Sequence, residues 1–440
     1  MKSCRRILLL FFVLILPLTA MTQEGISVRD VRGRLTEKVS FEPTRIAVEE
    51  ARYIGIEYIT AADSVIMKNC GIILQNDLDF SPFFENVPLD TFFMRHMEIE
   101  TMTMLAWTRL GASYVVKLEV EYPQNKIRLG YRLFSTESGK EINKNRMETE
   151  KKFYRTLVHQ IANDIYKFLT GDEGVYRTRI VYSKDLDNGA QELYIADYDG
   201  QNERQLTNNG SINLLPRFTP DGEYVYFTSY MDGEPRIYML NLNDNHIDKI
   251  TDYPGLNTAV SVAPDGKSFA CVLSKDGNSE LYLLDRKGKI IKRLSYSWAI
   301  ETAPTWSPDG KELAFTSDRT GSPQIYIMDI EFFDLKRLTF SGNYNDSPCW
   351  SPRGDRIAFV TRDRNFKICI IDVTGRNFRI LTEIGDNENP SFSPDGNHIV
   401  FSSNRLGSKE LYTMDLFGHN QRKITIGGGN TNPAWSPYKN

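Results

Sequence analysis

The sequence predicts an α/β domain followed by a six-bladed β-propeller, and two observations support this prediction. The first is a motif in the C-terminal part of the chain: an aromatic or apolar residue, a small residue, then Pro-Asp-Gly. Arg353 replaces Asp in the fourth copy, and the sixth copy is only Trp435-Ser436-Pro437. The second is its period, because the motif prolines lie 44, 44, 44, 42 and 43 residues apart; they are Pro220, Pro264, Pro308, Pro352, Pro394 and Pro437. A fixed period of this size indicates an array of stacked units, each too small to fold alone.

The N-terminus has the pattern of a secretory signal peptide. Lys2, Arg5 and Arg6 precede an apolar run over residues 7–16, and small residues follow near Ala20. The alternative is a single membrane anchor, but the run is shorter than the ~20 apolar residues that a span needs. We therefore expect residues 1–22 to be removed on export. The mature chain would be periplasmic, would not span the membrane, and would be a monomer.

Residues 23–170 lack the repeat and show helical and strand patterns instead. Strands are expected over residues 44–48, 112–118 and 126–135. Helices are expected over residues 63–78, 99–110 and 151–169. Together they predict a compact α/β domain, which ends in a linker over residues 171–178.

One repeat, residues 303–339, shows how each propeller blade is built. Four strands are expected, over residues 304–307, 312–317, 324–329 and 336–339. Pro304 is placed at the start of the first strand, where a missing N–H is tolerated. Pro308-Asp309-Gly310 forms the tight turn into the second strand. Four strands joined by tight turns are typical of a propeller blade, so residues 179–440 are predicted to form six.

The two ends of the array complete each other. Residues 433–436 resemble a first strand with no second strand behind it, whereas residues 178–183 resemble a second strand with no first. We therefore expect one blade to take its inner strand from the C-terminus and its other three from residues 179–207. Such closure joins the ring and removes an exposed sheet edge.

Composition and motifs argue against several classes of function. The formal charge is −4 and no Lys/Arg run is present, so nucleic-acid binding is not expected. The sequence has no nucleophile elbow, no H-E-x-x-H and no phosphate-binding glycine pattern. The five histidines are far apart and are expected to be surface or packing residues. We therefore expect no catalytic residues, no cofactor and no metal. Cys70, Cys271, Cys349 and Cys369 are expected to be buried free thiols.

The loops that enter the first strands are predicted to cluster at one mouth of the propeller channel. They are polar with a few aromatic residues, as is typical of a protein–protein interface in which a hydrated polar rim surrounds a few aromatic anchor residues. The alternative is that they are solvated turns. The candidate partner-binding residues in these loops are Leu256, Asn257, Thr258, Trp298, Glu301, Thr302, Tyr344, Asn345, Asp346, Glu388 and Asn389.

The chain resembles the TolB family of the Tol–Pal envelope system over nearly all of its mature length. The resemblance rests on the repeats, on Leu169 to Ile180 at the domain junction, on Trp107-x-x-Leu110-Gly111-Ala112, and on the terminal Pro433 to Tyr438. It implies that the peptidoglycan-associated lipoprotein Pal binds at the propeller mouth, where Leu256, Asn257 and Thr302 occupy the matching positions. Leu256 stands where some relatives have histidine.

The resemblance also implies that the N-terminal segment contacts the inner-membrane protein TolA, with Ile26, Val28 and Val31 as candidates. The implied role is a non-catalytic periplasmic adaptor that supports outer-membrane integrity and cell division. Two alternatives remain open: a propeller that binds a small molecule or glycan in its channel, and the gating domain of a peptidase-like protein. A peptidase would need a separate hydrolase domain, for which the sequence gives no sign.

Overall fold

The computed structural model describes residues 42–438, apart from residue 57 and residues 88–103. The expected signal peptide, the candidates Ile26, Val28 and Val31, and the first part of the helix expected over residues 99–110 therefore lie outside the described residues. Among the helices that are described, none is both long enough and apolar enough to cross a membrane.

In its described residues, the α/β domain contains one sheet of six strands. Its central strands have the order β3-β1-β4-β5-β6, and β2 pairs with β4. β1 pairs in parallel with β3 and β4, whereas β4, β5 and β6 are antiparallel. The strands are β1 (Thr44–Val48), β2 (Arg52–Tyr53), β3 (Phe84–Asn86), β4 (Tyr114–Glu121), β5 (Lys126–Ser135) and β6 (Glu141–Glu150).

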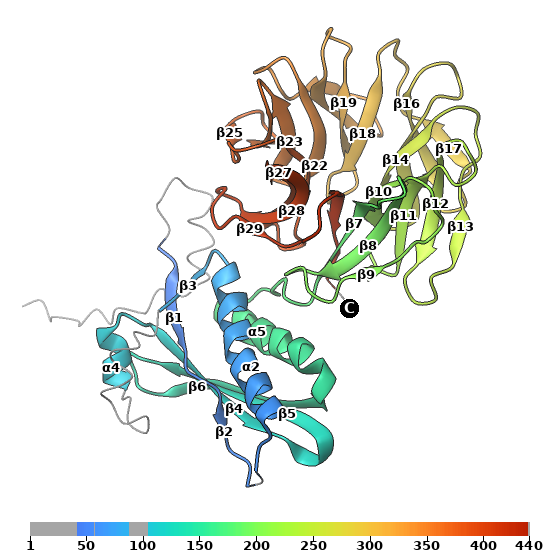
Figure 1. The fold of residues 1–440 in the computed structure, drawn as a ribbon. Coiled ribbons are helices and arrows are strands. Elements are labelled where there is room, and N and C mark those ends of the chain that lie inside the picture. Colours follow the sequence, from blue (N-terminus) through green and yellow to red (C-terminus); the bar gives the residue numbers. More distant parts are fainter. Residues whose placement is uncertain (1–41, 57, 88–103, 439–440) are drawn as a thin grey trace, which may run out of the picture. The chain divides into compact units, whose positions relative to one another are not determined.

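Two long helices, α2 (Ala61–Phe80) and α5 (Tyr154–Thr170), lie alongside each other against this sheet (Figure 1). Thr60 caps α2, because its Oγ1 accepts a hydrogen bond from the Asp63 N–H at 3.1 Å. α5 ends at Gly171, whose φ of 81° provides the left-handed cap that glycine favours. Shorter helical segments are α4 (Met104–Arg109), η1 (Pro123–Asn125) and η2 (Lys151–Phe153).

The propeller consists of six four-stranded sheets; five have their strands in sequential order, and the sixth begins with the C-terminal strand. The first contains β10 (Asn213–Phe218), β11 (Tyr224–Ser229), β12 (Arg236–Asn241) and β13 (Ile247–Lys249). The second contains β14 (Asn257–Val262), β15 (Ser268–Leu273), β16 (Glu280–Asp285) and β17 (Ile290–Arg293). The third contains β18 (Glu301–Trp306), β19 (Glu312–Ser317), β20 (Gln324–Asp329) and β21 (Leu335–Arg337).

The remaining blades follow the same pattern. The fourth contains β22 (Asn345–Trp350), β23 (Arg356–Arg362), β24 (Phe366–Asp372) and β25 (Arg379–Ile380). The fifth contains β26 (Asn387–Phe392), β27 (His398–Leu406), β28 (Ser408–Asp415) and β29 (Arg422–Lys423). The sixth has the order β30-β7-β8-β9, with β30 (Asn430–Trp435), β7 (Arg179–Asp185), β8 (Gln191–Asp197) and β9 (Arg204–Gln205). The predicted fold class is thus confirmed, including closure of the ring by the C-terminal strand.

A hydroxyl residue after each fourth strand explains part of the repeat. Each of these side chains is buried, and its oxygen accepts a hydrogen bond of 2.8–3.0 Å from a backbone N–H of the third strand. A buried donor at this position would otherwise be unpaired. The six residues are Thr207, Thr251, Ser295, Thr339, Thr382 and Thr425.

The first strands differ in one respect from the prediction. Pro304 is the fourth residue of β18 rather than its first. The pairing of β18 with β19 shifts register between Thr302 and Thr305, which marks a β-bulge. A bulge leaves a residue outside the ladder, so proline's missing N–H costs no hydrogen bond there.

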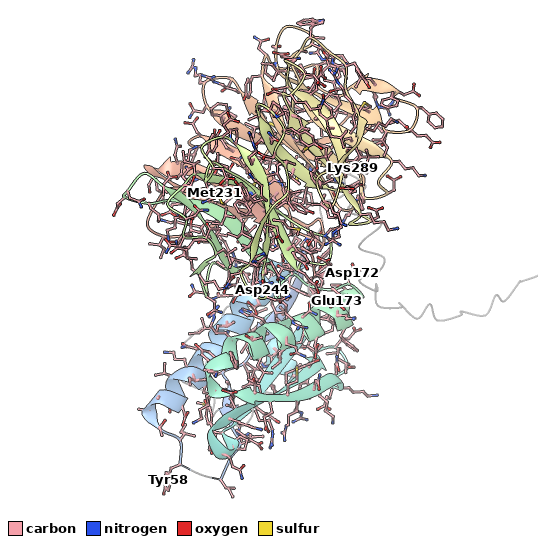
Figure 2. The ribbon with its side chains drawn as sticks, turned by 90° about the vertical axis from the view of Figure 1, so that its right-hand side faces the viewer. Tyr58, Asp172, Glu173, Met231, Asp244 and Lys289 are labelled. Carbon is pink, nitrogen blue, oxygen red and sulfur yellow. The ribbon has the colours of Figure 1, made fainter. Side chains whose placement is uncertain are left out.

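The junction between α5 and β7 is held by Glu173, which Figure 2 labels beside Asp172. Its side chain accepts hydrogen bonds from Asn163 Nδ2 at 2.6 Å and from Lys167 Nζ. Its carbonyl accepts another from the Tyr438 hydroxyl at 2.9 Å. The segment expected to be a linker is therefore bonded both to α5 and to the C-terminal residues.

Candidate functional site: the propeller mouth

Each first strand begins with a fully buried polar residue. These six residues are 0% exposed and occupy the first position of β10, β14, β18, β22, β26 and β30. Asn257 is typical: its Nδ2 donates to the carbonyls of Tyr253 (2.7 Å) and Gly255 (2.9 Å). Such bonds tie the loop that enters the strand to the blade. The six residues are Asn213, Asn257, Glu301, Asn345, Asn387 and Asn430.

Glu301 replaces asparagine in this set and is held differently. Its Oε1 accepts hydrogen bonds from Arg319 Nη2 at 2.8 Å and from Ser317 Oγ at 3.1 Å. Burial raises the pKa of Glu301, while the bond from Arg319 opposes that rise. A carboxylate is thus tolerated where the other blades use a neutral amide, because the third blade supplies a guanidinium.

A left-handed residue follows two positions later in all six first strands. The φ angles of these residues lie between 50° and 55°, although none is glycine. Each coincides with the β-bulge between the first and second strands. Non-glycine residues other than asparagine are uncommon in this region, and the repeat of the conformation in all six blades relates it to the geometry of the ring. The residues are Leu215, Ala259, Ala303, Ser347, Asn389 and Asn432.

Five of these left-handed residues line the channel together with neighbouring first-strand residues. The cavity they surround has a volume of about 120 Å³. Binding pockets for small organic ligands are typically ~300–1,000 Å³, so this space suits a few waters or an ion rather than a glycan. Its lining is Leu215, Arg217, Ala259, Val260, Thr302, Ala303, Pro304, Asp346, Ser347, Pro348, Asn389 and Pro390.

Large apolar side chains are exposed in the loops that lead from a fourth strand to the next first strand. Trp298 is 80% exposed, and its neighbours Ser297 and Ala299 are pinned because their carbonyls accept hydrogen bonds from Asn278 Nδ2. Exposed apolar side chains gathered in one region often mark protein interaction surfaces. We call this set the apolar rim: Tyr296, Trp298, Phe340, Ile384 and Ile426.

The structure places the predicted mouth residues at or near the start of the first strands, but in three different positions. Asn257 and Asn345 are buried loop anchors of the kind described above, and Glu301 is equally buried but is bonded to Ser317 and Arg319. Thr302, Asp346 and Asn389 line the channel entrance. Leu256 and Thr258 flank the anchor Asn257 and are half-buried, and Trp298 is in the apolar rim.

Tyr344 and Glu388 are also half-buried at this mouth. The Tyr344 hydroxyl donates to Asp346 Oδ2 at 2.9 Å, and burial together with the nearby Asp346 charge raises the pKa of Tyr344. Glu388 pairs with Lys409. The sequence interpretation missed the other four members of the apolar rim. One signal could have revealed three of them, because Tyr296, Phe340 and Ile426 each follow the repeated Ser or Thr directly.

The α/β domain contacts the opposite ends of the blades. Phe80 stacks on His398, with ring centroids 4.2 Å apart, and its carbonyl accepts a hydrogen bond from His398 Nε2 at 2.9 Å. Arg422 Nη2 donates to Asp79 Oδ2 at 2.8 Å. His398 follows a turn between first and second strands, and Arg422 follows a turn between third and fourth strands. None of these described contacts involves the loops of the mouth.

The sequence matches two families along its length. Residues 166–439 match the TolB beta propeller domain, and residues 38–142 match the TolB amino-terminal domain. The chain belongs to the TolB family. The family resemblance expected from the repeats and the junction is therefore confirmed.

Individual TolB proteins are similar to this chain at moderate identity. Proteins named Tol-Pal system protein TolB from Rickettsia felis and Rickettsia africae are 30% identical over 208 and 230 residues, covering 45% and 51% of this chain. The matches cover 46% and 49% of those proteins, so the chain spans about half the length of the curated relatives it matches. The crystal structure of TolB from Acinetobacter baumannii is 28% identical, with a TM-score of 0.79, over 90% of this chain and 98% of that chain.

Proposed function

We propose that this TolB-family chain is a non-catalytic periplasmic adaptor of the Tol–Pal system. In this proposal its propeller mouth binds a peptidoglycan-associated lipoprotein of the Pal type. The observation that carries the proposal is the apolar rim, with Trp298 80% exposed in the loop that leads into β18. Aromatic residues of this kind are the usual energetic anchors of protein interfaces.

Three further features support a protein partner rather than a substrate. The relatives from Rickettsia carry the name of the Tol-Pal system. The described contacts of the α/β domain lie at the other ends of the blades, so they leave the mouth accessible. The channel cavity of about 120 Å³ is small for a glycan, which weighs against the small-ligand alternative.

Within the mouth we assign different roles to the candidate residues. Leu256, Thr258, Trp298, Thr302, Tyr344, Asp346, Glu388 and Asn389 would contact the lipoprotein. Asn257 and Asn345 would act from beneath by fixing the loops that enter their strands, and Glu301 would act by holding Ser317 and Arg319. A contact of Ile26, Val28 and Val31 with a TolA-like protein, and the roles in outer-membrane integrity and division, belong to the same proposal and rest on family membership.

Calorimetric titration with the periplasmic domain of the organism's own Pal-like lipoprotein tests the proposal. Trp298→Ala removes an exposed anchor, and Thr302→Arg places a long charged side chain at the channel entrance. Each is expected to weaken binding at least tenfold while the melting temperature stays unchanged.

Phe332→Ala is the matched control. Phe332 is 70% exposed, but it lies between β20 and β21 at the other end of the same blade as Thr302. Its binding should equal that of the unmodified chain. If Phe332→Ala weakened binding as much as Trp298→Ala did, the mouth would not be the site.

A further inference from the structure

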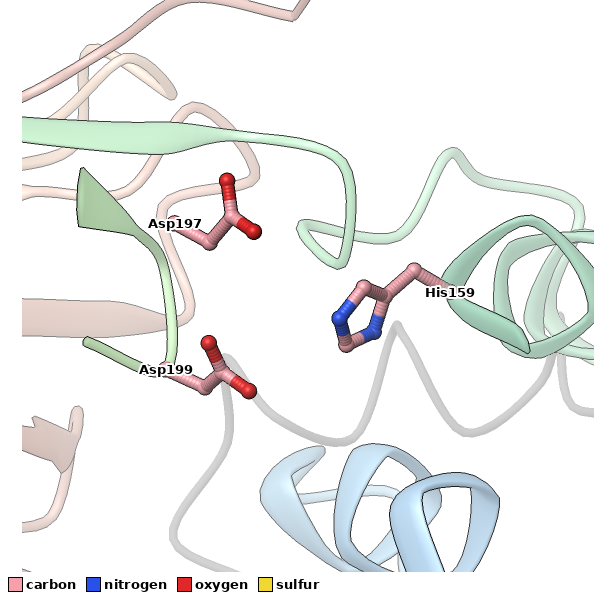
Figure 3. Close-up of side chains that lie close together, drawn as sticks. All are labelled: His159, Asp197 and Asp199. Carbon is pink, nitrogen blue, oxygen red and sulfur yellow. The ribbon is translucent and has the colours of Figure 1, made fainter. Parts of the chain in front are cut away.

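Three potential metal ligands meet where α5 contacts the propeller. His159 projects from α5, and Asp197 and Asp199 lie at the end of β8 and in the turn after it (Figure 3). One ligand atom from each residue lies within 4.8 Å of the others. The ligands of a four-coordinate Zn²⁺ with bonds of ~2.0–2.2 Å are separated by roughly 3–4 Å, so small side-chain movements would complete the geometry.

The imidazole of His159 is held in an orientation that suits a metal ligand. The side chain is 3% exposed, and Nδ1 donates to Asp77 Oδ2 at 2.8 Å. Asp77 also accepts a hydrogen bond from the Tyr198 hydroxyl at 2.5 Å on its other oxygen. A histidine that binds a metal usually donates its second ring N–H to a carboxylate, which fixes the tautomer and raises the basicity of the ligating nitrogen.

The remaining nitrogen has no partner in the described structure. His159 Nε2 is buried without a hydrogen bond to any described residue, and it faces the two carboxylates (Figure 3). A buried polar atom that lacks a partner costs free energy of about 1–3 kcal/mol, so such atoms call for an explanation. A cation between Nε2 and the carboxylates would satisfy all three groups.

The local charge also favours a divalent cation. Asp77, Asp197 and Asp199 bring three carboxylates, against two guanidiniums. Arg155 donates to Asp199 Oδ2 at 2.5 Å, and Arg179 lies opposite Asp197 in the β7–β8 ladder. Asp197 Oδ2 accepts a hydrogen bond from Asn202 Nδ2 at 2.6 Å, which orients that carboxylate. A cavity of about 600 Å³ is lined in part by Asp77, Arg155 and Asp199, so one of the three candidate ligands faces it.

We propose that His159, Asp197 and Asp199 form a Zn²⁺ site that joins the α/β domain to the propeller. One imidazole and two carboxylates are ligands that Zn²⁺ accepts, and a water would provide the fourth position. The site differs from the propeller mouth in place and in partner. It also revises the expectation that His159 is a packing residue.

The test uses the tag-free chain from residue 23, dialysed against EDTA and titrated with ZnCl₂ by calorimetry. One equivalent of Zn²⁺ is expected to bind and to raise the melting temperature with concentration, because the ion binds only the folded chain. His159→Gln and Asp197→Asn should each weaken Zn²⁺ binding at least tenfold. Titration with MgCl₂ should give no comparable binding, since Mg²⁺ prefers all-oxygen sites.

The matched control is His246→Gln. His246 is an exposed histidine whose Nε2 lies 3.2 Å from Asp248, so it tests whether a surface pair captures Zn²⁺. Binding should persist in this variant. The melting temperature of each EDTA-treated variant shows whether the variant is folded, so a loss of Zn²⁺ binding in a folded variant reports a lost metal ligand. Asp199→Asn is used in place of any variant that does not fold. The proposal would be overturned if the unmodified chain did not bind Zn²⁺, or if both ligand variants bound it unchanged. It would also be overturned if His246→Gln weakened Zn²⁺ binding as much as the ligand variants do.

Discussion

At the scale of single residues, the mouth depends on side chains that no partner can reach. Asn257 is 0% exposed, yet its amide holds two loop carbonyls, and its Oδ1 accepts a hydrogen bond from the Tyr253 N–H at 3.2 Å. The neighbouring Leu256 and Thr258 remain half-buried at the surface. A residue placed in a binding loop can therefore matter for affinity by fixing the loop, without touching the partner.

Asn257→Ala is expected to lower the free energy of unfolding by about 1–3 kcal/mol, because the Tyr253 carbonyl and N–H lose their bonds to this buried amide. The Gly255 carbonyl also loses its bond from Asn257 but keeps the one from Arg236 Nη1. Urea unfolding measures this change. The exposed Asn243→Ala is the control and should stay within about 0.5 kcal/mol of the unmodified chain. A loss of stability as small as that of the control would contradict the role of Asn257 as a loop anchor.

The buried thiols give a second prediction at this scale. Burial raises the pKa of Cys70 and of Cys369 to about 12, and it raises the pKa of Cys271 further. At pH 8 only about 10⁻⁴ of a thiol with a pKa of 12 is ionised, and the thiolate is the reactive form. These cysteines are free, as expected, but Cys349 is half-buried rather than fully buried.

In the native chain from residue 23, a thiol reagent at pH 8 should therefore leave Cys70, Cys271 and Cys369 unlabelled. In denaturant, the reagent should label all of them. Mass spectrometry of the labelled peptides resolves each cysteine. Cys349→Ser removes the partly exposed thiol and isolates the buried set. Rapid labelling of the three buried thiols in the folded Cys349→Ser chain would contradict their burial.

At the scale of secondary-structure elements, β30 matters most for stability, because it closes the propeller ring. It pairs with β7, and Trp435 Nε1 donates to Thr178 Oγ1 at 2.8 Å, so the chain's last strand closes a blade begun more than 200 residues earlier. Deleting residues 430–440 opens a sheet edge and removes the buried Trp435.

This deletion should lower the melting temperature of the whole propeller by at least 10 °C, because all six blades depend on ring closure. Differential scanning calorimetry measures it. Deletion of residues 439–440 alone is the control and should leave the transition in place. An unchanged transition after removal of residues 430–440 would show that closure by β30 does not stabilise the ring.

Elements also show what the sequence could and could not predict. The blades were predictable because Pro-Asp-Gly turns and apolar third strands repeat with a fixed period. β6 was missed because Glu141–Glu150 has almost no apolar alternation. It pairs along its length with β5 and is held partly by charge, as between Arg128 and Glu148 at 2.7 Å. Such cross-strand pairs depend on register, which a single sequence does not display.

The same reasoning applies to the candidate site. The loops of the mouth could be located from strand order, and Trp298 could be recognised as an exposed aromatic. The six left-handed bulges could not be predicted, because Leu215 and Ala259 have no intrinsic preference for a positive φ. The ring imposes this conformation where the first strands bend at the channel. The His159 cluster was missed because residues 159 and 197–199 meet only in the folded chain.

At the scale of the whole molecule, the propeller presents different chemistry at its two ends. One end has the apolar rim, and the other contacts α2 through Phe80, which is 4% exposed and lies against His398, Tyr198 and Arg422. Phe80→Ala should remove much of this contact, at a cost of about 3–5 kcal/mol. Calorimetry should then resolve separate transitions for the α/β domain and the propeller.

Ile72→Ala is the control for this prediction, since Ile72 lies on the same helix but is 44% exposed. Its melting profile should match that of the unmodified chain. If Phe80→Ala and Ile72→Ala gave the same profile, the Phe80 contact would not couple the two domains.

The central claim is that the propeller mouth binds a Pal-type lipoprotein, and photocrosslinking in intact cells tests it most directly. A photoreactive amino acid replaces Thr302 at the channel entrance, and mass spectrometry identifies the crosslinked partner. The expected result is an adduct with a peptidoglycan-associated lipoprotein, which is absent when the same group replaces Phe332 at the opposite end of the blade. A lipoprotein adduct at position 332 but not at position 302, or no protein adduct at positions 302, 298 and 344, would contradict the claim.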